Sequence, residues 1–485
     1  MKEKVLKLAN KYKNLPSPLK SSVWYTICNF INKGIALLSL PIFTRLMTQE
    51  EYGTYTIFQS WYSIFVIFSS LNIYMSSYTK GLLTYKEDRQ RFTSSLLGLT
   101  TTITIFLTII YFSFIDFWTS VFDLSPILMG AMLLELMFVP AYEFWSARER
   151  FDFKYKKFVI VSIVLSVLTV ACSAISIIIF SSYKVEAKIY TEILIKCVVF
   201  VFLFVMLICN GRCFFNKKYW KYAILFNLPL IPHYLSTFIL NQADRIMIGD
   251  MIGTAEAGMY SVAYSISNLM FLFVNAINFS LVPYIYKRIH TSEFDSIKKN
   301  TGPLFFVVAL LCILTMLFAP EVVFIFGGEK YMDAKWIIPS VSASVFFIFL
   351  YSMFSNLEYY YKKTWQISFA SIICASINIL LNYFFISKFG YHAAGYTTLF
   401  SYILLALCHF AMYKWVMRKE IKVIKNLYNM KFIVFSTIFV LSCMFIIIFT
   451  YNYFFIRYSL IGISLLLCII FRKKLIELIK NIMVK

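Results

Sequence analysis

Charged residues are scarce in this sequence. Only 14% of the 485 residues are Asp, Glu, Lys or Arg, whereas 60% are hydrophobic. Soluble domains carry roughly 25% charged residues, so the composition excludes an ordinary water-soluble protein. Apolar runs recur from Ser22 to Phe471 with short polar breaks between them. A helix needs about 20 apolar residues to cross a bilayer, so these runs predict an integral membrane protein.

Alternating polar and apolar positions, which would indicate strands, are also absent. The segment from Phe435 to Thr450 is nearly continuous in its apolar character. An outer-membrane barrel would instead show segments of about 10 residues with every second position polar. We therefore predict an all-α integral membrane fold.

The chain lacks several sequence signatures of chemistry. None of its ten cysteines forms a CxxC pair, and eight lie inside apolar runs, so neither a disulfide framework nor a zinc site is expected. There is no Gly-rich phosphate loop, GxSxG or HExxH motif. We expect a protein that is not an enzyme and that binds no cofactor and no metal.

The net charge of +22 indicates orientation rather than nucleic-acid binding, because no basic arm stands apart from the apolar runs. We predict about fourteen transmembrane helices, at 22–46, 54–79, 93–117, 124–146, 158–181, 187–209, 220–243, 257–286, 303–326, 334–360, 365–387, 391–416, 431–450 and 453–471. With the N-terminus inside, the inner segments hold 36 of the 46 Lys and Arg residues and the outer side holds 8. Basic residues are retained in the cytoplasm, so we expect a multi-pass protein of the bacterial inner membrane with both termini cytoplasmic.

Two pairs of landmarks predict an internal repeat. Glu51-Tyr52-Gly53-Thr54-Tyr55 and Glu256-Ala257-Gly258-Met259-Tyr260 are offset by 205 residues, and the lysine pairs before the fifth and eleventh spans are offset by 206. Parallel repeats are common in transporters, with the substrate site between the halves. The expected organisation is a cytoplasmic N-terminal segment 1–21, a six-helix lobe 22–209, a cytoplasmic linker 210–219, a second six-helix lobe 220–416, two extra helices within 417–471 and a cytoplasmic tail 472–485.

Ionisable residues inside the predicted spans or near their ends are the main site candidates, because charge in the bilayer is costly and faces a wet cavity or a partner. The basic candidates for a cationic substrate cavity are Lys33, Arg45, Lys196 and Arg245. The acidic candidates for ion coupling or ion pairing are Glu135, Asp244 and Glu358.

Each candidate has a structural alternative. The lysines can pair with a carboxylate such as Glu135, and Asp244-Arg245 can form a local ion pair at a helix end. Glu143 and Glu358 lie near inner ends, where contact with cytoplasmic water is the simpler expectation.

Prolines mark candidate hinges in the spans. Pro41 lies in the first span, and Pro229 and Pro232 lie three residues apart in the seventh, followed by His233. Proline removes a backbone donor and bends a helix, which suits halves that rock against each other. Asn and Gln residues are also frequent within the spans, as expected for a cavity that binds sugar hydroxyls.

The openings of the two halves carry the most specific motifs. The first reads Asn32-Lys33-Gly34, then Leu40-Pro41-Ile42-Phe43-Thr44-Arg45-Leu46. The second reads Leu230-Ile231-Pro232-His233, then Asp244-Arg245-Ile246-Met247-Ile248-Gly249 and Ala257-Gly258-Met259-Tyr260-Ser261. In order and spacing the chain resembles the polysaccharide transport family, which includes O-antigen flippases of the Wzx type. The resemblance in layout covers essentially the whole chain.

This resemblance implies a MATE-like fold of the MOP exporter superfamily, with two pseudo-symmetric six-helix bundles plus two C-terminal helices. It implies a flippase that moves undecaprenyl-diphosphate-linked oligosaccharides from the cytoplasmic to the periplasmic leaflet by alternating access. Lys33, Arg45 and Arg245 match the family's cationic lumen, and Glu135 is the candidate for coupling to a proton or sodium gradient. The implied partners are the lipid-linked oligosaccharide, membrane lipids and the polysaccharide polymerase machinery, with no nucleic acid.

Three other functions remain as alternatives. A lipid II-type flippase and a multidrug exporter belong to the same superfamily, but the acidic residues of multidrug exporters do not map clearly onto this chain. A polytopic glycan polymerase or ligase typically resembles chains with a large outer loop, and every predicted outer loop here is short.

Overall fold

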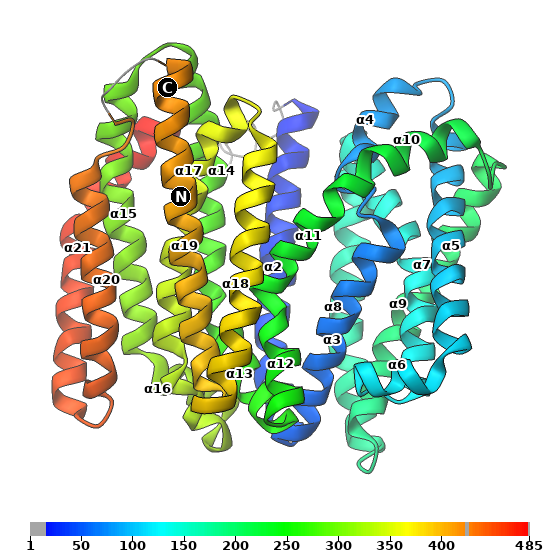
Figure 1. Cartoon of the computed structure of the whole chain (residues 1–485), viewed down its shortest axis with the longest axis horizontal. Coiled ribbons are helices and arrows are strands. Elements are labelled where there is room, and N and C mark those ends of the chain that lie inside the picture. The colour runs from blue at the N-terminus through cyan, green and yellow to red at the C-terminus, as the bar shows by residue number, and fades with distance from the viewer. Residues whose placement is uncertain (1–15, 422–425, 484–485) are drawn as a thin grey trace, which may run out of the picture. The chain divides into compact units, whose positions relative to one another are not determined.

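The computed structural model describes residues 16–421 and 426–483, and every secondary-structure element in these ranges is helical. Residues 1–15 of the predicted N-terminal segment and 484–485 of the predicted tail lie outside the described residues. The chain forms two compact units, 1–47 with 58–235 and 48–57 with 236–485 (Figure 1).

The first unit is built around α7 and α9, which pack on each other and on their neighbours α5 and α8, while α2 packs on α8. Its helices are α2 (Ser17–Leu46), α3 (Gln49–Ser70), α4 (Ser77–Thr84), α5 (Arg89–Ser113), α6 (Ile115–Phe122), α7 (Pro126–Phe151), α8 (Tyr155–Ile179), α9 (Lys184–Gly211), α10 (Lys217–Asn227), the 3₁₀ turn η1 (Leu228–Leu230) and the first half of α11 (Ile231–Phe238). The N-terminal turns of α3 belong to the second unit.

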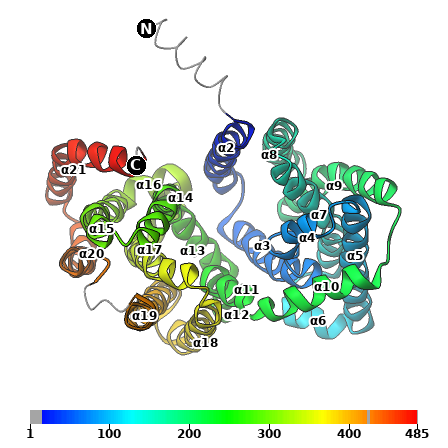
Figure 2. The same cartoon turned by 90° about the horizontal axis from the view of Figure 1, so that it is seen from above.

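The second unit surrounds α17, which packs against α13, α14, α15, α19 and α20 (Figure 2). Its remaining elements are the π-helix η2 (Ile239–Ala243), α12 (Asp244–Met251), α13 (Thr254–Ser267), α14 (Leu269–His290), α15 (Phe294–Leu317), α16 (Ala319–Gly327), the 3₁₀ helix η3 (Glu329–Trp336), α17 (Ile338–Tyr360), α18 (Thr364–Phe389), α19 (His392–Val416), the π-helix η4 (Met417–Ile421), α20 (Met430–Thr450) and α21 (Phe454–Met483). The first turns of α17 contain the buried residues Ser340, Ser342 and Ser344. Their small side chains allow neighbouring helices to pack closely against α17.

Twelve helices in the described ranges are long and apolar enough to cross a membrane. The predicted spans 54–79 and 453–471 fall outside these twelve. Helix α3 begins with three polar residues and ends at Ser70, and the apolar part of α21 runs only from Phe454 to Leu467. The all-helical membrane fold is confirmed, and the expected number of about fourteen is approximate.

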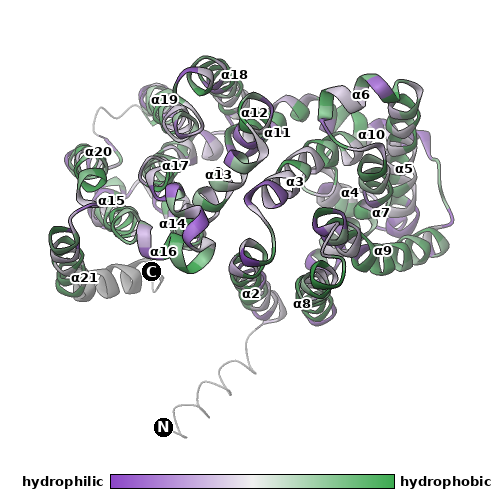
Figure 3. Cartoon of the chain, turned by 90° about the horizontal axis from the view of Figure 1, so that it is seen from below, coloured by the Kyte–Doolittle hydropathy of each residue, from purple (hydrophilic) through white to green (hydrophobic). Residues whose placement is uncertain are grey.

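Helix α9 has an exposed apolar face and a separate face that carries charged residues. Leu194, Val198 and Phe202 lie four residues apart and are 66–67% exposed, as expected for a face that contacts lipid acyl chains. Figure 3 shows hydrophobic residues over much of α5 and α9. The charged residues of α9 are spaced in the same way on another face, described below.

The seventh predicted span is broken where its prolines lie. Pro229 is inside the 3₁₀ turn η1, Pro232 is in the first turn of α11, and the π-helix η2 follows before α12. Each proline lacks a backbone donor, which explains the departure from regular α-helix. Pro41, in contrast, lies within the continuous helix α2.

The second predicted span is broken without proline. Helix α3 ends at Ser70, and α4 begins at Ser77. Leu71 and Asn72 have φ values of 48° and 47°, in the left-handed region that β-carbon-bearing residues seldom adopt.

The two copies of the repeat motif contact each other within the second unit. A β-carbon built on Gly53 would lie 1.7 Å from the carbonyl oxygen of Thr254, and one on Gly258 would lie 2.5 Å from that of Gln49. Thr56 and Ser261, also 205 residues apart, are joined by a hydrogen bond of 3.0 Å. The contact of Gly53 with Thr254 is therefore repeated, with the two copies exchanged, in the contact of Gly258 with Gln49. Reciprocal contacts of this kind are those expected across a twofold axis.

The units differ from the predicted lobes at two places, for identifiable reasons. Residues 48–57 belong to the second unit because Gly53 contacts Thr254 closely and Gln49 contacts Gly258. Residues 220–235 stay with the first unit, because Trp220 Nε1 donates to the carbonyl of Ser95 at 2.8 Å and Asn227 Nδ2 donates to Ser77 Oγ at 2.6 Å.

Candidate functional site

A charged pair in the first unit joins two of the predicted site residues. Lys196 Nζ of α9 lies 3.0 Å from Glu135 Oε1 of α7, and Tyr62 OH of α3 donates to the same oxygen at 3.1 Å. The Glu135 side chain is 2% exposed and that of Lys196 is 23% exposed. The two charges compensate each other, which a buried carboxylate requires.

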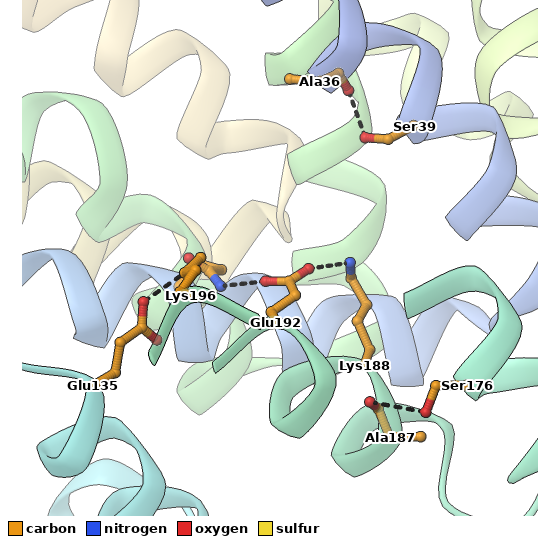
Figure 4. Close-up of polar contacts among 9 residues, drawn as sticks. Ala36, Ser39, Glu135, Ser176, Ala187, Lys188, Glu192 and Lys196 are labelled. Carbon is orange, nitrogen blue, oxygen red and sulfur yellow. Dashed lines mark hydrogen bonds and ion pairs between the residues drawn. The ribbon is translucent and has the colours of Figure 1, made fainter. Parts of the chain in front are cut away.

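A second pair lies one to two turns closer to the N-terminus of α9. Lys188 Nζ is 2.5 Å from Glu192 Oε1, and Gln59 Nε2 donates to Glu192 Oε2 at 3.5 Å. Lys188 also lies over the Phe43 ring, 3.3 Å from its centroid. Figure 4 shows Lys188 directed at Glu192 and Lys196 directed at Glu135.

Lys188, Glu192 and Lys196 thus form one face of α9 at a spacing of four residues, and with Glu135 they form a neutral set of two cations and two anions. Lys188 and Glu192 were not among the predicted site residues. The four-residue spacing, with opposite charges on one helix face, was the signal for this cluster.

In the second unit, Asp244 is the centre of a buried polar cluster. Its carboxylate accepts hydrogen bonds from Tyr260 OH of α13, from Asn382 Nδ2 of α18 at 2.6 Å and from Thr398 Oγ1 of α19 at 2.7 Å. Asp244 is 1% exposed. Three helices therefore converge on one carboxylate through neutral donors.

Arg245, the next residue, interacts with a different set of groups. Its Nε donates to Ser261 Oγ at 3.1 Å, its Nη1 donates to the carbonyl of Asn241 at 3.1 Å, and its guanidinium lies 4.6 Å from the centroid of the Tyr264 ring. In the described part of the chain no salt bridge joins Asp244 to Arg245, although the Arg245 charge acts on the Asp244 carboxyl. The π-helix η2 immediately precedes both residues, and π-turns are frequent at functional sites.

Glu358 is not at a water-exposed inner end as expected. It is 0% exposed on α17, and its Oε1 lies 2.8 Å from His409 Nδ1 on α19, itself 1% exposed. Its Oε2 has no hydrogen-bond partner among the described residues. The expectation of contact with water failed because α17 is the central helix of its unit. His409 was missed, although a histidine within an apolar span is itself a signal.

Lys33 is not part of these clusters. Lys33 is near the middle of α2, is exposed, and forms no ion pair or hydrogen bond within the described ranges. Arg45 is exposed in the last turn of the same helix. The structure therefore brings Lys196 together with Glu135, and leaves Lys33 as a cation in mid-span without a charge partner among the described residues.

Comparison with known proteins gives two family matches. The model of a family described as polysaccharide biosynthesis protein matches residues 19–289, and the MatE family model matches residues 229–384. Two proteins of Haemophilus influenzae are similar over most of the chain. One, Lsg locus putative protein 1, is 24% identical over 379 residues, which cover 74% of this chain and 89% of the relative. The other, an uncharacterized membrane protein, is 23% identical over 381 residues, or 74% and 88% of the two chains.

Solved structures with the same fold include two membrane transporters. The lipid II flippase MurJ in an inward closed conformation matches with a TM-score of 0.69 at 15% identity, over 93% of this chain and 100% of that one. A multidrug resistance MATE family transporter in an inward-facing conformation matches with a TM-score of 0.57 at 12% identity, over 82% and 96%. These likenesses confirm the MATE-like fold that the sequence resemblance implied.

Proposed function

The chain belongs to the polysaccharide biosynthesis protein family, and from this premise we propose that it is a flippase for lipid-linked oligosaccharides. The proposed substrate is an undecaprenyl-diphosphate-linked repeat unit of O-antigen or a related surface polysaccharide. It moves from the cytoplasmic to the periplasmic leaflet of the inner membrane by alternating access.

Lys33 is the observation that supports this function best. An ammonium group in the middle of a membrane span is costly unless it meets water or an anion. Lys188 and Lys196 are compensated by Glu192 and Glu135, whereas Lys33 has no ion pair among the described residues. A diphosphate head group supplies the missing negative charge, and a fixed cation replaces part of the hydration that this group loses in the bilayer.

The test is to delete the gene in its native host and to follow the lipid-linked repeat unit in each leaflet with a membrane-impermeant sugar probe. We expect the unit to accumulate on the inner face and surface polysaccharide to disappear. Lys33→Ala should fail to restore export at normal membrane levels. Lys33→Arg should restore it in part, because the charge remains.

The neighbouring Gly34→Ala is a matched control, because a β-carbon there meets nothing within 4 Å. Normal export by Lys33→Ala would remove the cationic site from the proposal. If single units reach the outer face without the gene but fail to extend into chains, the protein acts in polymerisation and the flippase proposal is wrong. A lipid II-type or drug exporter is indicated if the repeat unit crosses normally while cell-wall synthesis or drug resistance changes.

We further propose Asp244 as the residue that couples transport to a proton or sodium gradient. Glu135 pairs with Lys196, and Glu358 pairs with His409. Asp244 receives only neutral donors and has no ion pair in the described part of the chain. A buried carboxylate that forms no salt bridge is a candidate site for H⁺ or Na⁺, because an incompletely compensated charge in the interior is unfavourable.

Asp244→Asn tests this coupling in proteoliposomes that carry the host's lipid-linked repeat unit. An imposed proton gradient and an imposed sodium gradient are applied separately, and the gradient that accelerates flipping by the native protein identifies the ion. We expect the variant to lose the acceleration. An unchanged response to both gradients would assign the coupling to another group.

A further inference from the structure

The break between α3 and α4 forms one wall of a pocket that the residues discussed above do not use. The pocket has a volume of about 620 Å³, and Tyr74, Met75 and Thr79 of the break and α4 face Glu143, Ala147, Arg150 and Phe151 of α7 across it. All of these residues belong to the first unit. Cavities of 300–1,000 Å³ are typical of small-molecule sites.

The break is held in place rather than loose. Asn227 of α10 is fully buried, its amide oxygen accepts a hydrogen bond from Ser76 Oγ, and its Nδ2 donates to Ser77 Oγ at 2.6 Å. Asn72 N donates to Ser70 Oγ at 3.1 Å. The left-handed conformations of Leu71 and Asn72 cost free energy, and such strain persists where the surrounding contacts impose it.

An unwound helix within a membrane span has a specific meaning. Irregular backbone at membrane depth is tolerated where it is buried in protein or lines a water-filled cavity. Discontinuous helices of this kind form the substrate and ion sites of many transporters. The α3–α4 break interrupts the predicted span 54–79 near its predicted cytoplasmic end. Its residues Leu71, Asn72 and Ile73 are buried, and Tyr74 and Met75 line the cavity.

The polar groups of the pocket are available to a ligand. Neither the Glu143 carboxylate nor the Tyr74 hydroxyl forms a hydrogen bond with any other described residue. Arg150 is exposed and is held by a bond from its Nη2 to Ser146 Oγ at 3.3 Å. Together they offer an acceptor, a donor and an aromatic ring on facing walls.

We propose that this pocket, defined by Tyr74, Thr79, Glu143 and Arg150, is a subsite for one sugar ring of the transported oligosaccharide. A carboxylate accepts bonds from ring hydroxyls, the guanidinium donates to ring or hydroxyl oxygens, and an aromatic face packs on the apolar C–H face of the sugar. The inference rests on the proposed function, and it extends that function from the head group to the glycan.

The position of the pocket assigns it a step in transport. It lies where the predicted second and fourth spans end on the cytoplasmic side, so the sugar enters it before the lobes rearrange. The same contacts must be given up for release, so the subsite selects the glycan at entry while Lys33 binds the diphosphate.

The test is a binding measurement on the purified full-length protein in lipid nanodiscs with two probes. One probe is the repeat-unit oligosaccharide released by mild acid from the host's own lipid-linked precursor, and the other is undecaprenyl phosphate. We expect Tyr74→Ala and Glu143→Gln each to weaken oligosaccharide binding by about tenfold or more, the effect of losing a ring contact or a charged hydrogen bond. Binding of undecaprenyl phosphate should not change.

Glu149→Gln is the matched control, because it removes a carboxylate from the same helix outside the pocket lining. Tyr74→Phe retains the ring and should retain most of the affinity, which separates ring contact from the hydroxyl. The melting midpoint of each variant shows that it is folded.

Three results would overturn the subsite. These are oligosaccharide binding that is unchanged in both variants, equal weakening of both probes, and a native protein that binds the lipid phosphate but not the oligosaccharide. In the last case the flippase proposal stands without the subsite. A native protein that binds neither probe refutes both proposals together.

Discussion

The crossing of α3 and α13 at Gly53 and Gly258 leads to a sharp stability prediction. A β-carbon on Gly53 would lie 1.7 Å from the carbonyl oxygen of Thr254 and 3.1 Å from the backbone nitrogen of Gly258. Both atoms belong to backbone, so no side-chain rotation relieves the clash. Ordinary contact begins near 3.4 Å, so the two helices would have to separate by about 1.7 Å.

Gly53→Ala should therefore be strongly destabilising. Overpacking costs about 1–3 kcal/mol and occasionally more, and a backbone clash belongs at the upper end of this range. Separation also weakens the hydrogen bond between Thr56 and Ser261. At roughly 2 °C per kcal/mol for a large domain, the midpoint of thermal unfolding should fall by about 5 °C.

The assay is thermal unfolding of the purified protein in one detergent, with Gly34→Ala as the matched control. Gly34 also lies in a helix, but a β-carbon there meets nothing within 4 Å. Alanine favours helix over glycine by about 1 kcal/mol, so this control should be neutral or stabilising. An unchanged midpoint for Gly53→Ala would refute the close crossing and with it the contact between the two repeats.

The double variant Gly53→Ala/Gly258→Ala gives an independent check. Either alanine alone forces the same two helices apart, so the second should add less than its individual cost. Strict additivity would mean that the two glycines do not meet.

Three further predictions concern buried polar pairs. Lys196→Met should lower stability by about 3–5 kcal/mol, because it leaves the Glu135 carboxylate buried without compensation, and adding Glu135→Gln should restore most of the loss in a melting experiment. His409→Leu should be more damaging than the double variant with Glu358→Leu, since the single change leaves a carboxylate at 0% exposure unpaired, and equal midpoints would contradict this. Asn227→Ala should cost about 1–3 kcal/mol through the loss of its bonds to the α3–α4 break, measurable as earlier unfolding and faster proteolysis at the break.

Much of the fold followed from the sequence because hydrophobicity is a local property. The continuous apolar runs set the helical membrane class and the approximate position of each span. The repeat offset of 205 residues, read from two short motifs, is the offset of Thr56 and Ser261, which are hydrogen bonded. The break at Pro229 and Pro232 was also predictable, since proline removes a backbone donor wherever it lies.

The break at Leu71 and Asn72 was not predictable in this way. No proline or glycine lies between Leu71 and Ser76, and the unwound backbone is held by Asn227, about 150 residues away in the chain. Local propensity contains no information about such a partner.

Candidate site residues show the same division. The sequence identified Lys33, Glu135, Lys196 and Glu358 as costly charges within spans and Asp244 and Arg245 as charges at a span end, because that judgement needs only the depth of a residue in the membrane. Which of them pair was decided by tertiary structure alone. Lys196 meets Glu135 because α7 packs on α9, and Glu358 meets His409 because α17 packs on α19. The sequence by itself thus determined that charges lie inside the membrane, and the packing of helices distant in sequence determined which charges are compensated and which are left for a substrate or an ion.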